Sequence, residues 1–154
     1  YEDTAEILGT YGYQQYEISN YAKPGYECRH NCGYWTRKDY LGLGLGASSF
    51  VEHQRFQNTS DLKEYLEQEY HHIHIETLDK KSEMEEFMFL GLRLMAGVSR
   101  QQFEKTFQVT LDSVYGEVLR KLKGEQLIEE VAGYVRLTEH GIDVSNYVLS
   151  EFLL

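Results

Sequence analysis

The segment of residues 16–50, YEISNYAKPGYECRHNCGYWTRKDYLGLGLGASSF, decides how the rest of the chain is interpreted. It combines a Pro-Gly pair, a His-Asn pair, a Tyr-Trp pair and glycines at alternate positions, Gly42, Gly44 and Gly46. A long segment without periodicity is uncommon in a compact domain unless it has a function. We therefore predict that this segment faces a ligand.

The composition limits the classes of function. With 154 residues the chain can hold one ordinary domain, or a small domain and part of another. Its formal net charge of −10 argues against a nucleic-acid backbone or an anionic membrane as the main partner. It contains no run of about 18 apolar residues, so we predict no membrane span. Two cysteines are too few for a disulfide scaffold and favour a cytoplasmic location.

The first residues predict a helix, a glycine turn and a strand. Residues 2–10 have the apolar spacing of a short helix, and residues 13–18 alternate like a strand. This order is typical of an α/β barrel or a parallel sheet, where functional groups gather at the carboxyl ends of the strands. Because the chain begins inside an apparent helix, with neither an initiator Met nor a signal peptide, we expect it to be a piece of a longer protein.

The middle of the chain alternates between loops and short elements. Residues 20–40 predict a long loop, and the alternate glycines of residues 40–46 predict a strand that a ligand approaches closely. Residues 51–59 predict a hairpin arm. Ser60 or Asp61 is expected to cap a helix that runs to about residue 70, before an extended segment, HHIHIETL.

The C-terminal part predicts three helices, a hairpin and a last helix. Ser82 and Glu85 form a capping box that opens a helix ending at Gly97. The remaining signals are a cap at Ser99, an apolar stripe from Leu111 to Gly124, a hairpin around Ala132-Gly133, and a cap at Thr138 for a helix that ends at Phe152. This is the order of a winged-helix domain, with a boundary near residues 77–82.

The glycine run does not fit a dinucleotide-binding loop. That motif needs a helix immediately after the glycines, whereas Ser48 and the residues that follow lack helical periodicity. Close backbone approach to a flat ligand is one alternative. Tight packing of the segment is the other.

Two groups of residues could suggest a metal. Cys28 and Cys32 have C-x3-C spacing, but an iron–sulfur or zinc site needs more ligands than this pair. The histidines around residues 71–74 could bind zinc from alternate strand positions, although the segment otherwise resembles a polar connector; this group comprises Glu69, His71, His72, His74 and Glu76. Packing or solvation is the simpler interpretation of both groups.

The set His30, Asn31, Tyr34 and Trp35 points to a macrocycle. An imidazole can be an axial ligand of haem iron, and aromatic rings supply flat apolar walls. A loop histidine bonded to its own backbone explains the same residues.

The predicted winged-helix order raises the possibility of nucleic-acid binding. Residues 99–124 contain five basic and three acidic residues, a net of +2. That charge is a weak phosphate-binding signature in an acidic chain, so we predict no nucleic-acid partner.

Several segments resemble one known family. YEISNYAKPG, RHNCGYW and YLGLGLGASSF are similar to the oxygen-independent coproporphyrinogen III oxidase family of radical SAM proteins, and within it to the HemW-type haem chaperone branch. EEFMFLGLRLMAGVS, LKGEQLIEE and RLTEHGIDVSNYVLSEFL resemble the C-terminal domain of the family. The resemblance covers nearly the whole chain.

The resemblance implies an α+β fold in three segments. Residues 1–58 would be the last strands of a partial radical SAM α/β barrel. Residues 59–81 would be a linker helix and connector. Residues 82–154 would be a winged-helix-like, mostly helical C-terminal domain.

The resemblance also implies cofactors and a function in porphyrin and haem metabolism. The intact protein would use S-adenosylmethionine and a [4Fe-4S] cluster. His30 would bind haem iron, with Asn31, Tyr34 and Trp35 beside the tetrapyrrole. The vicinity of S-adenosylmethionine would include Cys32, Gly33, Gly44 and Ser48.

Oxidase and haem chaperone both remain open, as does a winged-helix interaction module. The C-x3-C-x2-C cluster motif of the family is absent, so we expect no catalytic activity from this chain alone. Truncating a barrel would expose strand edges, and we therefore expect self-association.

Overall fold

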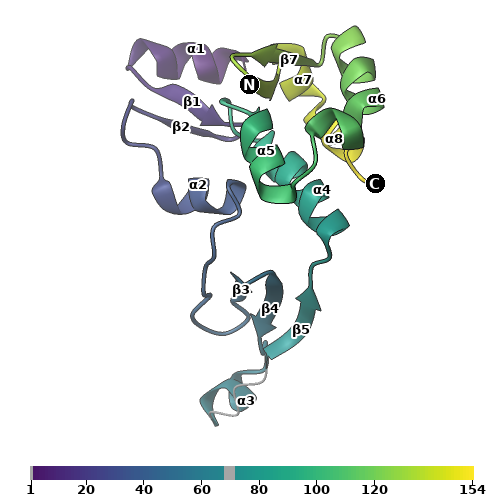
Figure 1. Ribbon diagram of the computed structural model, residues 1–154. Coiled ribbons are helices and arrows are strands. Elements are labelled where there is room, and N and C mark those ends of the chain that lie inside the picture. Colours follow the sequence, from purple (N-terminus) through teal and green to yellow (C-terminus); the bar gives the residue numbers. More distant parts are fainter. Residues whose placement is uncertain (1, 68–71) are drawn as a thin grey trace. The chain divides into compact units, whose positions relative to one another are not determined.

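The computed structural model of the chain describes residues 2–67 and 72–154 (Figure 1). Its contacts divide the chain into two compact units. The first unit combines Tyr1–Thr36 with Met84–Leu154, and the second is Arg37–Glu83. These units reflect contacts within this chain. The segments 1–58, 59–81 and 82–154 come from a family resemblance and stay predictions.

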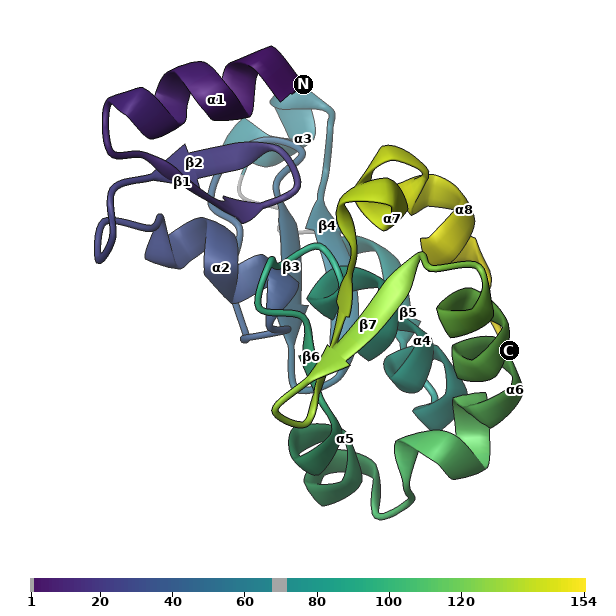
Figure 2. The same cartoon turned by 90° about the horizontal axis from the view of Figure 1, so that it is seen from above.

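The first unit opens with a helix beside a hairpin. Helix α1 (Glu2–Thr10) is followed by strands β1 (Gln14–Glu17) and β2 (Asn20–Ala22), which pair antiparallel (Figures 1 and 2). The helix and the strand predicted for residues 2–18 are therefore confirmed. Every named strand pair among residues 2–67 and 72–154 is antiparallel, so the parallel sheet of a barrel stays a prediction.

The loop predicted over residues 20–40 was wrong in part. It contains β2 and also helix α2 (Arg29–Trp35). Seven residues give too few turns for a helical period to show, and Gly33 lowers the helix propensity further.

The second unit is built on an antiparallel sheet with the strand order β3-β4-β5. The strands are β3 (Ser48–Val51), β4 (Gln54–Asn58) and β5 (His72–Thr77), which confirms the hairpin arm and the extended segment. Asp61 rather than Ser60 caps helix α3 (Leu62–Leu66), because its carboxylate accepts hydrogen bonds from the amides of Lys63 and Glu64. The helix ends four residues before the predicted position; residues 68–71 lie outside the described ranges.

The strand predicted for residues 40–46 was wrong. Only Tyr40 makes a β-bridge, to Phe50, and the following residues form a loop. Gly44 and Gly46 have φ angles of +107° and +66°, which a strand does not allow. Gly44 and Gly46 therefore allow the chain to turn here, and they do not belong to an extended strand.

Helix α4 (Lys80–Gly91) begins and ends earlier than predicted. The Asp79 carboxylate accepts a hydrogen bond from the Ser82 amide at 2.7 Å, so Asp79 replaces the predicted Ser82–Glu85 capping box. Bonds from the backbone and then the side chain of Ser82 lower the pKa of Asp79. The helix stops at Gly91, where a Cβ would approach Cγ2 of Val98 to 2.7 Å. After Gly91 the chain turns, and Leu94 forms an antiparallel bridge with Glu17 where the predicted helix would have continued to Gly97.

The rest of the first unit follows the predicted order. Ser99, Thr110 and Thr138 cap the helices α5, α6 and α7 through their hydroxyl oxygens, and the hairpin lies where Ala132-Gly133 placed it. The predicted last helix is divided in two at Val144. The elements are β6 (Val98–Ser99), α5 (Arg100–Phe107), α6 (Leu111–Gly124), β7 (Ile128–Val131), β8 (Tyr134–Leu137), α7 (Glu139–Asp143) and α8 (Ser145–Ser150).

These elements enclose the main core. The sheet has the order β6-β8-β7, and α5 and α6 pack beside it (Figure 2). Aromatic rings at the centre meet edge to face or tilted, with centroids 4.8 to 6.1 Å apart, which is the favoured range; they are Phe87, Phe103, Phe107, Tyr115 and Phe152. Burial raises the pKa of Tyr115, whose hydroxyl has no hydrogen-bond partner among the described residues.

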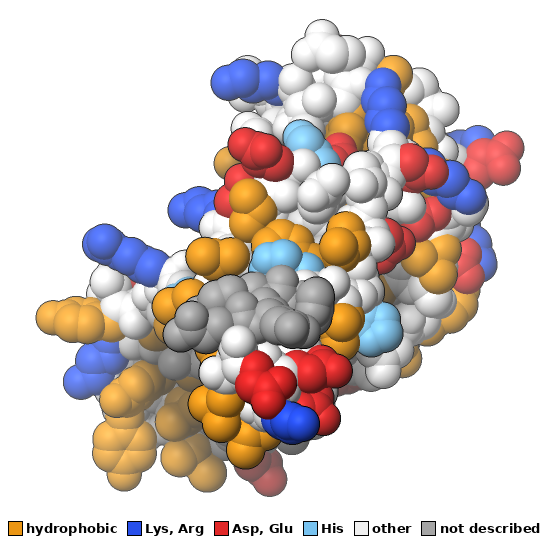
Figure 3. Space-filling model, turned by 90° about the horizontal axis from the view of Figure 1, so that it is seen from below, with side chains coloured by type: hydrophobic (Ala, Val, Ile, Leu, Met, Phe, Trp, Pro, Cys, Tyr) orange, Lys and Arg blue, Asp and Glu red, His pale blue; other side chains and the backbone are white. Residues whose placement is uncertain are grey.

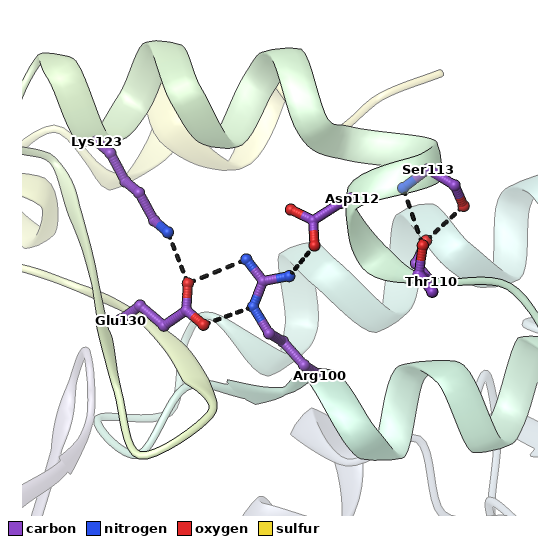
Figure 4. Close-up of polar contacts among 6 residues, drawn as sticks. All are labelled: Arg100, Thr110, Asp112, Ser113, Lys123 and Glu130. Atoms are coloured by element: carbon purple, nitrogen blue, oxygen red, sulfur yellow. Dashed lines mark hydrogen bonds and ion pairs between the residues drawn. The ribbon is translucent and has the colours of Figure 1, made fainter.

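A charged network joins the start of α5 to α6 and β7 (Figure 4). The guanidinium of Arg100 donates to Asp112 at 2.5 Å and to one carboxylate oxygen of Glu130 at 3.0 Å, and its Nε forms an ion pair with the other Glu130 oxygen at 2.8 Å. Lys123 contacts Glu130 at 2.6 Å. The bonds from Lys123 and Arg100 lower the pKa of Glu130. Burial opposes ionisation of Arg100, but its bonds to Glu130 and Asp112 outweigh this and raise its pKa.

Across residues 2–67 and 72–154, the structure contains no helix with the length and apolar character that crossing a bilayer requires.

Candidate functional site

Helix α2 presents the predicted His30–Trp35 motif. The His30 Nε2 and Tyr34 Oη atoms share a hydrogen bond of 2.8 Å, and the two rings meet edge to face with centroids 4.8 Å apart. Residues four apart lie on the same face of a helix, so this contact follows directly from the spacing. His30 is exposed and Tyr34 is half-buried. The pair therefore forms a polar, aromatic surface that a ligand can reach.

The other two members of the motif attach α2 to the first unit. The Asn31 amide donates to the hydroxyl of Tyr16, on β1, at 3.2 Å. The Arg93 guanidinium lies over the Trp35 ring, 4.4 Å from its centroid. The indole Nε1 is buried and has no acceptor among the described residues, so stacking holds this ring. The motif thus has an accessible pair and an anchoring pair.

Arg93 is itself held by a buried carboxylate. Glu17, at the end of β1, is fully buried, and its Oε1 lies 2.6 Å from Nη2 of Arg93. Its Oε2 accepts hydrogen bonds from the Ser19 amide, at 3.2 Å, and from Asn20. A buried charge is tolerated only when it is paired and hydrogen-bonded, and Glu17 meets both conditions.

The backbone reinforces this junction. The Ile18 amide donates to the Arg93 carbonyl at 3.0 Å, and the Met95 amide donates to the Tyr16 carbonyl at 3.1 Å. Glu17 and Leu94 form an antiparallel bridge. The turn after α4 is therefore joined to the end of β1 by one isolated bridge and two backbone hydrogen bonds.

The sequence interpretation missed Glu17 and Arg93. The sequence did contain an indication of this pair, because each charged residue has apolar or aromatic neighbours: Glu17 in the segment YEI and Arg93 in the segment GLRLM. Charged residues in such positions are buried only when they are paired.

Cys28 and Cys32 lie one helical turn apart, since the Cys32 amide donates to the Cys28 carbonyl at 2.9 Å. The two cysteines do not form a disulfide, and Cys28 is exposed while Cys32 is half-buried. Among residues 2–67 and 72–154, no group of three or more metal-binding side chains forms, so neither the cysteines nor the histidines of β5 make such a site. Glu69 and His71 lie outside the described residues. His72 instead packs its ring on Phe56, with centroids 4.3 Å apart.

The glycine loop is held from the sheet of the second unit. The side-chain amide of Asn58 donates to the backbone carbonyls of Gly42 and Gly44, at 3.2 and 2.9 Å. Gln57 donates to the Gly46 carbonyl at 2.8 Å, and Ser48 pairs with Gln57 in the sheet. Leucine side chains between the glycines are exposed; they are Leu41, Leu43 and Leu45.

The residues predicted to lie near S-adenosylmethionine fall in both units. Cys32 and Gly33 are on α2 in the first unit, whereas Gly44 and Ser48 belong to the second. Their grouping around one ligand stays a prediction.

Two basic side chains of α6, Lys121 and Lys123, are paired with carboxylates. The Lys121 ammonium lies 2.7 Å from Glu151, and its bonds to Glu151 and Tyr147 raise its pKa. Lys123 and Arg100 are held by Glu130. In Figure 3 several of the Lys and Arg side chains have carboxylates beside them. The absence of a nucleic-acid partner stays a prediction, and this pairing supports it.

Comparison with known proteins identifies relatives along the whole chain. Residues 78–144 match the family described as the HemN C-terminal domain. The chain is 37% identical to the heme chaperone HemW of Lactococcus lactis, over 100% of the chain, and 35% identical to that of Bacillus subtilis, over 99%. The chain spans 41% of the length of each of these relatives.

A solved structure has the same fold. The radical SAM enzyme HemN, a coproporphyrinogen III oxidase from Escherichia coli, matches 99% of the chain with a TM-score of 0.76. The match covers 39% of that protein at 18% sequence identity, so it establishes similarity of fold.

Proposed function

The chain belongs to the family of HemN- and HemW-type radical SAM proteins, and from this premise we propose that it supplies a haem-binding surface on α2. His30 is the iron ligand, and Tyr34 and Trp35 lie beside the macrocycle. The curated relatives above carry the name heme chaperone, which favours haem transfer over oxidation of a porphyrin side chain. Oxidation by the longer protein is the second candidate, favoured by the fold match to HemN.

The observation that supports this proposal best is the His30–Tyr34 hydrogen bond on the accessible face of α2. The other two motif residues, Asn31 and Trp35, attach the same helix to Tyr16 and Arg93. Haem, when bound, would supply an iron that the imidazole of His30 could ligate. Because Nε2 is the atom bonded to Tyr34, binding of the iron through this nitrogen would replace the His30–Tyr34 hydrogen bond. The exposed ring of His30 can make this exchange without unfolding α2.

The cysteines of this chain do not fit a [4Fe-4S] cluster. Such a cluster in this family needs a third cysteine, and the chain has two, one helical turn apart. The cluster and the chemistry of S-adenosylmethionine would therefore depend on residues outside this sequence. We expect the purified chain not to cleave S-adenosylmethionine, and cleavage would contradict this.

The finer domain assignments belong to the same proposal. Helices α4, α5 and α6 followed by the β7–β8 hairpin support a winged-helix-like domain over residues 82–154. Residues 1–58 would close a barrel and residues 59–81 would connect the two parts. Cys32, Gly33, Gly44 and Ser48 would lie near S-adenosylmethionine. The cytoplasmic location rests on the cysteine content alone.

Haem titration tests the proposal. We expect the 154-residue chain to give the Soret band of a histidine-ligated haem, and His30→Ala to lose that band or weaken binding. The matched control is His140→Ala, an exposed histidine on α7 outside the motif. Spectra unchanged by His30→Ala, or changed equally by His140→Ala, would refute axial ligation by His30.

A further inference from the structure

We propose that Arg93 is a positioning residue for the haem-binding surface: stacked on Trp35 and paired with Glu17, it fixes the orientation of α2. This inference rests on the proposed function. It assigns a role to a residue more than fifty positions beyond the motif, in the turn that follows α4.

Helix α2 needs outside support. It has seven residues, none of them buried, and its N-cap residue Cys28 makes no side-chain capping bond. Isolated helices of this length are marginal in water, so their stability comes from tertiary contacts. Two contacts that attach the motif to the first unit are the Asn31–Tyr16 hydrogen bond and the Trp35–Arg93 stack.

Arg93 is suited to hold Trp35 because its own position is determined from two sides. Its side chain is 26% exposed and pairs with a carboxylate that is 0% exposed. Its carbonyl accepts a hydrogen bond from the Ile18 amide at 3.0 Å. The planar guanidinium can pair with Glu17 at its edge while its face lies on the indole.

The geometry also separates positioning from ligand contact. His30 is exposed and precedes Trp35 by more than one helical turn, so Arg93 acts on His30 through the helix. Residues that orient a metal ligand typically change metal affinity by about 10–100-fold when mutated. We expect substitutions of Arg93 to weaken haem binding by a factor of similar size.

Trp35 provides a direct probe, because it is the single tryptophan of the chain. Its fluorescence, excited selectively and measured without haem, reports whether Arg93 covers the ring. Arg93→Lys keeps a positive charge for Glu17 but loses the planar face, and Arg93→Gln loses both. Arg136→Gln is the control, because Arg136 forms a comparable 2.7 Å pair with Glu129 away from α2.

We expect both Arg93 variants to shift the Trp35 emission to longer wavelength and to increase its quenching by acrylamide, while Arg136→Gln leaves both unchanged. We expect haem to bind the Arg93 variants about tenfold or more weakly, with a broadened Soret band. Circular dichroism checks that each variant is folded. If Arg93→Gln does not fold, the fluorescence and haem-binding measurements on Arg93→Lys decide the outcome.

Two results would overturn the inference. One is unchanged Trp35 fluorescence in both Arg93 variants. The other is a fluorescence shift with wild-type haem affinity and an unaltered Soret band. If the wild-type chain shows no His30-dependent haem spectrum, the proposed function fails instead. The fluorescence arm, measured without haem, distinguishes that outcome from a missing Arg93–Trp35 contact.

Discussion

Replacing Arg100 by alanine should destabilise the first unit more than an ordinary surface ion pair would. The guanidinium makes three charged contacts of 2.5 to 3.0 Å, to Asp112 and to both oxygens of Glu130 (Figure 4). Its side chain is 23% exposed, and those of Glu130 and Asp112 are 32% and 65% exposed. The contact with Asp112 is therefore screened, whereas the bidentate contact with Glu130 is partly protected.

From these exposures we expect Arg100→Ala to lower the free energy of unfolding by about 1–2 kcal/mol. The matched control, Arg136→Ala, removes a single contact between side chains that are 40% and 45% exposed. That variant should cost about 0.2–1 kcal/mol. Urea unfolding followed by circular dichroism measures both, and a double-mutant cycle with Glu130→Ala isolates the pair. Equal losses for the two arginine variants would refute the reasoning.

The same network predicts a pH dependence. Lys123 and then Arg100 hold the pKa of Glu130 below its ordinary value of 4.5. A lowered pKa in the folded state means that the stabilisation is fully present above pH 4.5 and is lost as the pH falls through the folded-state value. The stability difference between wild type and Arg100→Ala should therefore shrink at acid pH. A difference that grows on acidification would contradict this assignment.

Three further predictions concern packing and association. Gly97→Ala should destabilise the first unit by about 2 kcal/mol or more, because Gly97 has a φ of +75° and an added Cβ would approach the Arg136 Cβ to 2.6 Å. Urea unfolding measures this loss, and a variant as stable as the wild type would contradict it. Tyr115→Phe should leave the free energy of unfolding unchanged or raise it, because the buried hydroxyl has no hydrogen-bond partner among the described residues. A decrease in the free energy of unfolding above about 1 kcal/mol would contradict this. Light scattering should show the purified chain as a dimer or larger, and a clean monomer would count against the expected self-association.

Elements with local signals were predictable from the sequence. The caps at Ser99 and Thr138 and the hairpin at Ala132-Gly133 depend on residues within a few positions of one another. The i, i+3, i+4 stripe that starts at Leu111 likewise defines α6 without reference to the rest of the chain.

Elements that depend on distant contacts were predicted poorly. The helical pattern of α4 continues past Gly91 in the sequence, but the helix ends there and Leu94 forms a bridge with Glu17 instead. The alternate glycines suggested a strand, while the side chains of Gln57 and Asn58 hold the segment as a loop. In both cases the competing interaction comes from residues too far along the chain for periodicity to detect.

The candidate site shows the same division. The sequence by itself identified His30 and Tyr34 as candidate ligand residues from their residue types, but it did not determine their pairing, because a spacing of four brings two side chains together on one face only in a helix and this segment was predicted as a loop. The tertiary structure alone decided what holds that face in place. Glu17 and Arg93 are 76 residues apart, and they pair because a fully buried carboxylate has no water to replace the guanidinium.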